Sequence, residues 1–150
     1  MSLGLLSRAQ LARHIRSHVA AQLYDDSGST AQGTAIYSLS DPRDIRQIRY
    51  VGQTSAPKRR FLQHLNTARL WLPDETPWWV KSPKLRPLSQ WIRDLYGEEF
   101  RLPTMIISTW VNGVPAARLA ERTRICECLE QRLQLLNVEA QMIGRQILLL

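Results

Sequence analysis

Residues 34–52, TAIYSLSDPRDIRQIRYVG, decide the fold of this chain of 150 residues. Two parts of the stretch, 34–39 and 48–52, are rich in β-branched and aromatic side chains and predict strands. A charged turn around Asp41-Pro42 separates them. Because the connection is short, we expect the two strands to pair as an antiparallel hairpin.

Regular elements continue on the carboxyl side of this hairpin. A β-rich run over 104–111, followed by the turn Asn112-Gly113, predicts a third strand. Apolar spacing predicts a helix that begins at Pro57, a second over 88–95 that Gly97 stops, and a long one over 115–134. The order predicts an α+β fold, with a small three-stranded antiparallel sheet flanked by helices.

The length suits a single domain, 1–150. Apolar residues over 3–23 recur at helical spacing and predict an amphipathic helix. The same segment bears arginines and no acids, as transit peptides do, but its well-formed apolar stripe favours the helix. We divide the chain into an N-terminal helical extension 1–33, a core 34–137 with a Trp/Pro-rich insertion 66–87, and a tail 138–150 that is helical or extended.

The composition indicates a globular, basic protein. Hydrophobic residues make up 44% of the chain, enough for an ordinary core, and this excludes general disorder. The formal net charge is +7, and residues 41–70 alone carry +5. The bases are mostly arginine, whose planar fork of donors suits phosphate. This concentration favours a polyanion such as nucleic acid, although a solvated basic face is the alternative.

Cysteine usage and hydropathy restrict the compartment. The two cysteines, Cys126 and Cys128, lie two positions apart in a helical pattern, so their side chains diverge. This excludes a disulfide framework and a four-cysteine zinc site, and it favours a reducing, cytoplasmic location. No apolar run approaches the roughly 20 residues that span a bilayer, so we expect no membrane partner.

Two tripeptides in the predicted hairpin carry a resemblance. Ala35-Ile36-Tyr37 and Tyr50-Val51-Gly52 resemble the paired motif of the GIY-YIG nuclease family, with alanine and valine replacing the first glycine and the central isoleucine. Further residues follow in the family's order and spacing over 35–137: they are Arg60, His64, Glu121 and Asn137.

The resemblance implies a DNA endonuclease whose catalytic residues are Tyr37, Tyr50, Arg60, His64, Glu121 and Asn137. It implies that Tyr37 is the general base, that His64 takes or directs the phenolic proton, and that Arg60 binds phosphate oxygens. Tyr50 would orient water or phosphate, and Asn137 would donate a hydrogen bond that fixes the site. Each residue also has a structural alternative, since strand tyrosines usually pack and Asn137 suits a helix C-cap.

Glu121 is the expected metal ligand. We place it at the first turn of the long helix, on the same stripe as Ile125 and Leu129, so that it points inward. An inward carboxylate is costly unless it is paired or bound to a cation, and Mg²⁺ (or Mn²⁺) suits a single carboxylate that shares the ion with substrate phosphate. The alternative is a carboxylate that interacts with the helix N-terminus.

Basic residues around these positions are candidates for DNA contact: Arg49, Lys58, Arg59, Arg69, Lys81, Lys84 and Arg86. Three of them flank Trp78-Trp79 in the insertion, where aromatic and basic groups could stack bases and follow a backbone. The insertion could equally cover the sheet edge or form a dimer contact. We interpret His14 and His18 as helix surface, Glu127 and Glu130 as solvated, and the cysteines as packing residues.

Three functions remain open at this point. The first is a metal-dependent endonuclease of a restriction, mobile-element or repair type, acting with a homodimer partner or a targeting partner. The second is a catalytically weak nucleic-acid-binding module of the same fold, which the replacement of glycine by Ala35 would allow. The third is a non-specific DNase that acts as a toxin or antiphage effector.

Overall fold

The computed structural model describes residues 9–10, 13, 33–140 and 142. The N-terminal expectations, including the helix over 3–23 and the surface histidines His14 and His18, lie almost entirely outside these residues. The elements along the chain are β1 (Thr34–Asp41), β2 (Asp44–Thr54), α2 (Pro57–Ala68), η3 (Trp78–Lys81), α3 (Arg86–Glu99), β3 (Thr104–Val111) and α4 (Val114–Glu130).

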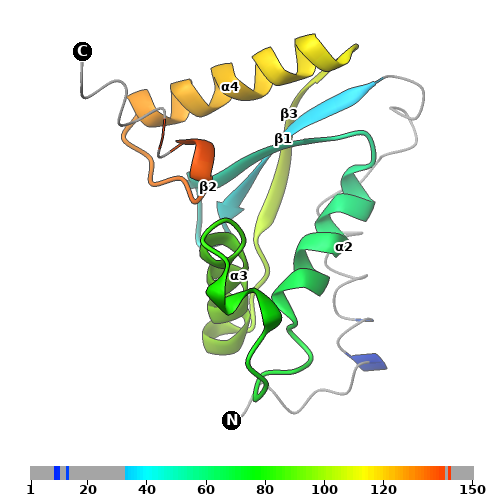
Figure 1. Cartoon of the computed structure of the whole chain (residues 1–150), viewed down its shortest axis with the longest axis vertical. Helices are drawn as coiled ribbons and strands as arrows, with labels where there is room; N and C mark the ends of the chain where they lie inside the picture. Colours follow the sequence, from blue (N-terminus) through cyan, green and yellow to red (C-terminus); the bar gives the residue numbers. More distant parts are fainter. Residues whose placement is uncertain (1–8, 11–12, 14–32, 141, 143–150) are drawn as a thin grey trace.

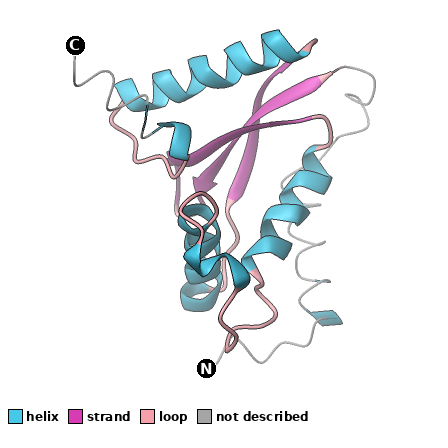
Figure 2. Ribbon diagram, in the orientation of Figure 1, coloured by secondary structure: helices cyan, strands magenta, loops and turns pink. Residues whose placement is uncertain are grey.

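The sheet has three antiparallel strands in the order β2-β1-β3, which confirms the predicted α+β fold (Figure 2). β1 and β2 form the hairpin, and β3 pairs with the other side of β1. In the hairpin register Tyr37 stands opposite Gly52, and Leu39 stands opposite Tyr50. The central strand β1 is buried from Ala35 to Ser40.

Helices cover both faces of the sheet, with α4 on one face and α2 and α3 on the other (Figure 1). Successive side chains of a strand point to opposite faces, so β1 contributes to two cores. Tyr37 and Leu39 pack with Phe61 of α2 and Ile92 of α3. Ile36, on the opposite face, packs with Ile125 of α4.

The hairpin turn is shorter than the sequence predicts. The strands continue to Asp41 and resume at Asp44, so Pro42-Arg43 alone connects them. Arg43 donates to the Asp41 carboxylate through its backbone N–H and its guanidinium, at 2.7–2.9 Å. The strands therefore reach into the charged segment. Its charges are paired at this exposed end of the sheet, where Arg43 forms ion pairs with Asp41 and Glu99.

Two predicted helix ends are wrong. α3 continues through Gly97 to Glu99, and Phe100 ends it in the left-handed conformation with φ 56°. Gly97 does not end the helix, because helical hydrogen bonding continues past it. The Phe100 N–H still donates to the Tyr96 carbonyl. α4 ends at Glu130 rather than at 134, and Arg132 takes φ 62° just beyond it.

The chain after α4 pairs with the outer edge of β2. Leu136 donates its backbone N–H to the Arg49 carbonyl at 2.6 Å. The side-chain amide of Asn137 accepts from the Val51 N–H at 3.0 Å and donates to the Val51 carbonyl at 2.7 Å. Helical residues 138–140 follow, and Ala140 is buried in the α4-side core. The first residues of the predicted tail therefore belong to the packed fold.

The Trp/Pro-rich insertion is more regular than the sequence predicts. It contains the 3-10 turn η3, and α3 begins at Arg86, inside the predicted insertion. Trp79 is fully buried, whereas Trp78 is 67% exposed. None of the described helices combines the length and the apolar character that crossing a membrane requires.

Candidate active site

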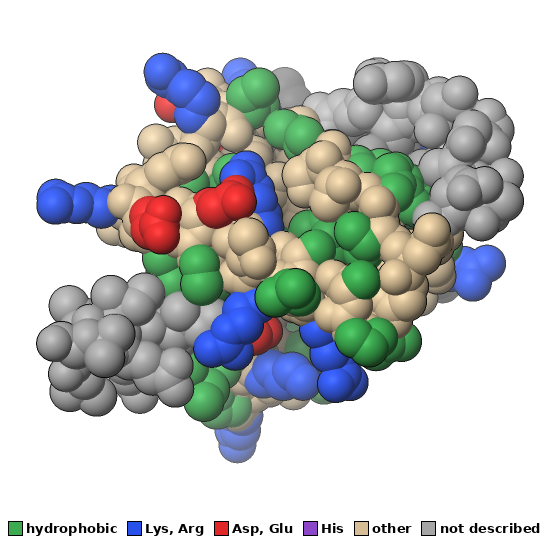
Figure 3. Space-filling model, turned by 90° about the horizontal axis from the view of Figure 1, so that it is seen from above, with side chains coloured by type: hydrophobic (Ala, Val, Ile, Leu, Met, Phe, Trp, Pro, Cys, Tyr) green, Lys and Arg blue, Asp and Glu red, His purple; other side chains and the backbone are tan. Residues whose placement is uncertain are grey.

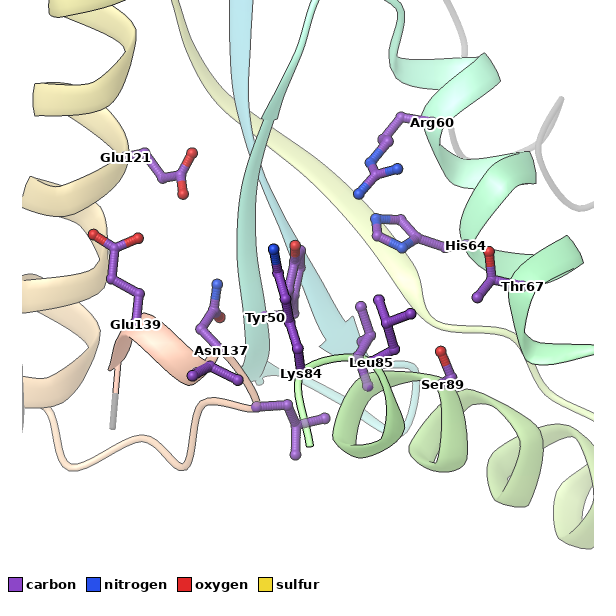
Figure 4. A pocket seen from close by; sticks show the side chains of 13 residues that line it. Tyr50, Arg60, His64, Thr67, Lys84, Leu85, Ser89, Glu121, Asn137 and Glu139 are labelled. Carbon is purple, nitrogen blue, oxygen red and sulfur yellow. The ribbon is translucent and has the colours of Figure 1, made fainter. Parts of the chain in front are cut away.

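A cavity of about 310 Å³ lies at the β2 edge of the sheet, where the two helical layers meet. Tyr50 of β2, Arg60 and His64 of α2, Glu121 of α4 and Asn137 all line it (Figure 4). These are five of the six predicted catalytic residues. Figure 4 shows Glu121 on one side of the cavity and Arg60 with His64 on the other. Long-range folding thus brings residues from 50 to 139 to one cavity.

Tyr37, the sixth, does not line the cavity but contacts His64, which does, and it is 1% exposed. Its hydroxyl is 2.7 Å from Nε2 of His64, and both groups are buried. Its ring occupies the space that a side chain at Gly52 would fill, because a Cβ built there would lie 2.5 Å from the Tyr37 oxygen. The glycine of the second tripeptide is therefore required for the position of the tyrosine of the first.

Three rings form a compact cluster. The centroids of Tyr37 and Tyr50 are 6.3 Å apart, and His64 lies 6.0 Å from Tyr37 and 5.4 Å from Tyr50. The expectation that both tyrosines approach one place is confirmed. Arg60, one helical turn before His64, interacts with both phenol oxygens through hydrogen bonding and charge.

Burial sets the protonation of this cluster. It raises the pKa of Tyr37 well above its usual value, as does the neighbouring Tyr50, and Arg60 opposes both effects. Burial also lowers the pKa of His64 to about 3, and the charge of Arg60 acts in the same direction. At neutral pH the pair is therefore a phenol and a neutral imidazole, and one imidazole nitrogen is an acceptor.

Glu121 is half-buried and lies about two turns into α4, which begins at Val114. Its predicted position at the first turn is wrong, because α4 already begins at Val114. The alternative of a carboxylate at the helix N-terminus is excluded by the same observation. Burial raises the pKa of Glu121, a hydrogen bond with Gln53 lowers it, and the charge of Glu139 raises it.

The donor set fits a divalent cation that retains water. Across the described part of the chain there is no group of three or more His, Cys, Asp and Glu side chains suited to a metal. Glu121 and Glu139 nevertheless line the same cavity opposite Arg60. One or two carboxylates together with phosphate oxygens of a substrate are the usual ligands of Mg²⁺ in such sites.

Asn137 has both ends of its amide engaged with the backbone of Val51, beside Tyr50. The bond that it donates holds the β2 edge against the chain after α4. Asn137 thus contributes to the position of Tyr50. It does not serve as a helix C-cap, because α4 ends at Glu130.

The seven basic residues predicted to contact DNA are in different surroundings. Lys84 lines the cavity, and the other six do not. Arg49 lies over the Trp91 ring at 5.7 Å, and Arg69 lies over the Trp71 ring at 5.8 Å. The remaining four are exposed: they are Lys58, Arg59, Lys81 and Arg86.

Sequence reasoning missed several residues that line the cavity: Thr67, Leu85, Ser89 and Glu139. Ser89 is buried, and Glu139 is exposed with Oε1 4.0 Å from Nη1 of Arg122. Glu139 lies two positions after Asn137, within the segment that was assigned to the tail. An acidic residue only two positions from a predicted site residue is the sequence signal that could have indicated Glu139.

The remaining sequence interpretations concern residues away from this cavity. Cys126 and Cys128 are free, and Cys128 is buried in the α4-side core. Glu127 and Glu130 are exposed, as expected. Ala35 is fully buried in β1 and is not among the described non-glycine residues with positive φ. An alanine therefore fits where the family has glycine.

A second hollow, of about 460 Å³, lies between β3 and α4. Its lining combines small and apolar side chains with Arg124 and Glu127, and Leu119, which also lines it, is 67% exposed. It contains none of the predicted catalytic residues, so the cavity at the β2 edge is the candidate active site. No protein-family model, no curated protein and no solved structure matches this chain.

Proposed function

We propose that this protein is a divalent-metal-dependent DNA endonuclease of the GIY-YIG kind, which hydrolyses phosphodiester bonds. The observation that carries the proposal is the cavity that places Tyr50, Arg60 and His64 opposite Glu121. Phosphodiester hydrolysis needs an activated water and positive charge on the scissile phosphate. Cationic and proton-accepting groups on one wall, with a carboxylate on the other, meet these needs.

Arg60 and Glu121 act on the phosphate. The guanidinium of Arg60 binds two phosphate oxygens with charge-assisted hydrogen bonds. Glu121 would hold Mg²⁺ or Mn²⁺ on the other wall of the cavity, and Glu139 lies close enough to add negative charge there. When bound, the divalent cation supplies positive charge beside the scissile phosphate.

The hydrogen-bonded pair of Tyr37 and His64 accepts the proton of the attacking water. A phenol whose pKa is raised is a poor base alone. Neutral His64, 2.7 Å from the phenol oxygen, can take the phenolic proton as Tyr37 takes the proton from water. Tyr50 orients the water or the phosphate from the cavity floor, and Asn137 fixes its strand.

DNA is the proposed substrate because the chain is basic and its cavity combines cations with a carboxylate. A cytoplasmic location and a homodimer or targeting partner belong to the same proposal. A DNase that acts as a toxin would share this chemistry and differ in its specificity.

Supercoiled plasmid with Mg²⁺ tests the proposal. We expect nicked or linear product that disappears with EDTA and in the Glu121→Ala variant. Glu130→Ala is the matched control, because Glu130 is an exposed glutamate of the same helix. Discrete fragments would indicate a specific target, and a smear would indicate none.

Intact plasmid, together with intact branched and single-stranded substrates, would contradict the proposal. If the protein still bound these substrates, the catalytically weak binding module would replace it. Full activity of Tyr37→Phe would remove Tyr37 from the proton-accepting pair while leaving the rest of the mechanism in place.

A further inference from the structure

One arginine of α3 anchors the start of the insertion. The terminal nitrogens of Arg93 lie 2.6–3.1 Å from five backbone carbonyl oxygens at the end of α2 and the start of the insertion. These carbonyls belong to Ala68, Arg69, Leu72, Pro73 and Glu75. A segment rich in proline thus follows one defined path over the surface.

A second anchor lies beside the cavity. The indole of the fully buried Trp79 donates to the Thr67 carbonyl at 2.5 Å, and Thr67 itself lines the cavity. Ser82 then caps the following turn, since its hydroxyl accepts from the Leu85 N–H at 3.2 Å. The insertion is therefore fixed to the last turn of α2, next to His64.

Between these anchors and α3 the chain carries Lys84 into the cavity. Figure 4 shows the Lys84 side chain extending into the space between Glu121 and the pair Arg60 and His64. Among the described residues no carboxylate forms an ion pair with Lys84. Its ammonium group is thus a second cation at the cavity and is available to an anion.

We infer that Lys84 binds a backbone phosphate of the strand in the cavity, next to the phosphate that Arg60 holds. The insertion then forms a wall of the active site and determines how the strand lies across it. The inference rests on the proposed function, because it takes a polynucleotide as the occupant. An ammonium group on a flexible stem suits a phosphate that must be positioned, whereas the planar fork of Arg60 suits the reacting one.

The experiment compares Lys84→Ala with Arg101→Ala, which removes an exposed positive charge that neither lines the cavity nor belongs to the predicted DNA contacts. Binding of a labelled DNA strand and duplex is measured by fluorescence anisotropy in EDTA, at several salt concentrations. We expect Lys84→Ala to weaken binding by about tenfold and to reduce the salt slope by about 0.7–0.9. Arg101→Ala should change binding by less than about twofold, and Lys84→Arg should keep most of the wild-type affinity.

Equal losses for the two alanine variants would overturn the inference, because general charge would explain them. An unchanged Lys84→Ala would overturn it as well. Binding is measured without metal, so the outcomes separate the two proposals. A wild-type protein that binds DNA but never cuts it would contradict the proposed endonuclease activity. The ratio of the DNA affinities of the two alanine variants would still decide the role of Lys84. A wild-type protein that cuts, with equal variants, would contradict Lys84 alone.

Discussion

Gly52 leaves space for the Tyr37 ring in the hairpin. The addition of one methyl group at Gly52 therefore tests whether the candidate site needs this close contact. In Gly52→Ala the new methyl would lie 2.5 Å from the phenol oxygen, so the Tyr37 ring or the β2 backbone must shift, and the contact between Tyr37 and His64 is disturbed. We expect a loss of roughly 1–3 kcal/mol in the free energy of unfolding, from overpacking, together with loss of cleavage. Urea denaturation and the plasmid assay measure the two effects.

Gly97→Ala is the control for this change. Gly97 lies inside α3, and a Cβ built there has nothing within 4 Å. Alanine should stabilise the helix by about 0.5–1 kcal/mol and leave cleavage unchanged. Equal stability of the two variants would mean that the approach of Tyr37 to Gly52 is not tight in solution.

His64 predicts how stability depends on pH. Its pKa is lowered to about 3 in the folded protein, against about 6.5 in the unfolded chain. Between these values the unfolded state binds the proton and the folded state does not, so this contribution to stability falls as the pH falls from 6.5.

We expect the wild-type protein to lose on the order of 2 kcal/mol more than His64→Gln between pH 7.5 and pH 4.5. The comparison cancels the carboxylates that titrate in both proteins. Urea unfolding at the two pH values measures the difference. Parallel losses would show that the buried imidazole is protonated in the folded state.

At the scale of the elements, the insertion contains two adjacent tryptophans with opposite surroundings. Trp79 is fully buried and donates to the Thr67 carbonyl, whereas Trp78 is 67% exposed. Trp79→Ala should cost about 3–5 kcal/mol in the free energy of unfolding, because a large buried ring is removed.

Trp78→Ala should change stability by less than about 0.5 kcal/mol, because this side chain is exposed. Thermal denaturation of the two variants decides between these environments. A large loss for Trp78→Ala would mean that its exposed side chain is covered in solution, for example by a second copy of the chain.

The elements that carry a strong local pattern were predicted from the sequence, and those set by distant contacts were not. The strands at 34–41 and 104–111 follow β-branched runs, and α2 follows Pro57. The end of α4 at Glu130 was missed, because the chain turns there to pair with β2. Asn137 was found by spacing, but its partner Val51 is 86 positions away and no local signal indicates it.

The candidate site divides in the same way. Motif spacing indicated Tyr37, Tyr50, Arg60, His64 and Glu121, which the fold brings to one place. Glu139 and the position of Lys84 depend on how the chain after α4 and the insertion pack around the β2 edge. That packing is a tertiary property, and propensity and periodicity do not encode it.

At the scale of the whole molecule, one candidate active site and a net charge of +7 restrict how the protein would act. Seen from the side of α4, Lys and Arg side chains are more frequent than Asp and Glu (Figure 3). A basic surface favours association with DNA at low salt. The described part of the chain carries one set of site residues, and under the proposed function one such set would cut one strand at a time.

We therefore expect supercoiled plasmid to become nicked first and linear only later. A time course on agarose gels, repeated over a range of protein concentrations, measures the order of the products. Linear product without a nicked intermediate would contradict action by a single chain. It would indicate two sites acting together in a dimer.

Arg93 has a consequence for where this chain accepts changes to its length. Residues 73–76 are exposed and mostly polar, and they resemble a surface loop that would accept a tag or a graft. Five carbonyls of 68–75 share the Arg93 guanidinium, however, and an added residue would separate some of them from it. Limited proteolysis should accordingly spare this loop, and a peptide tag placed there should destabilise the protein even though Trp79 still fixes the segment that precedes Lys84.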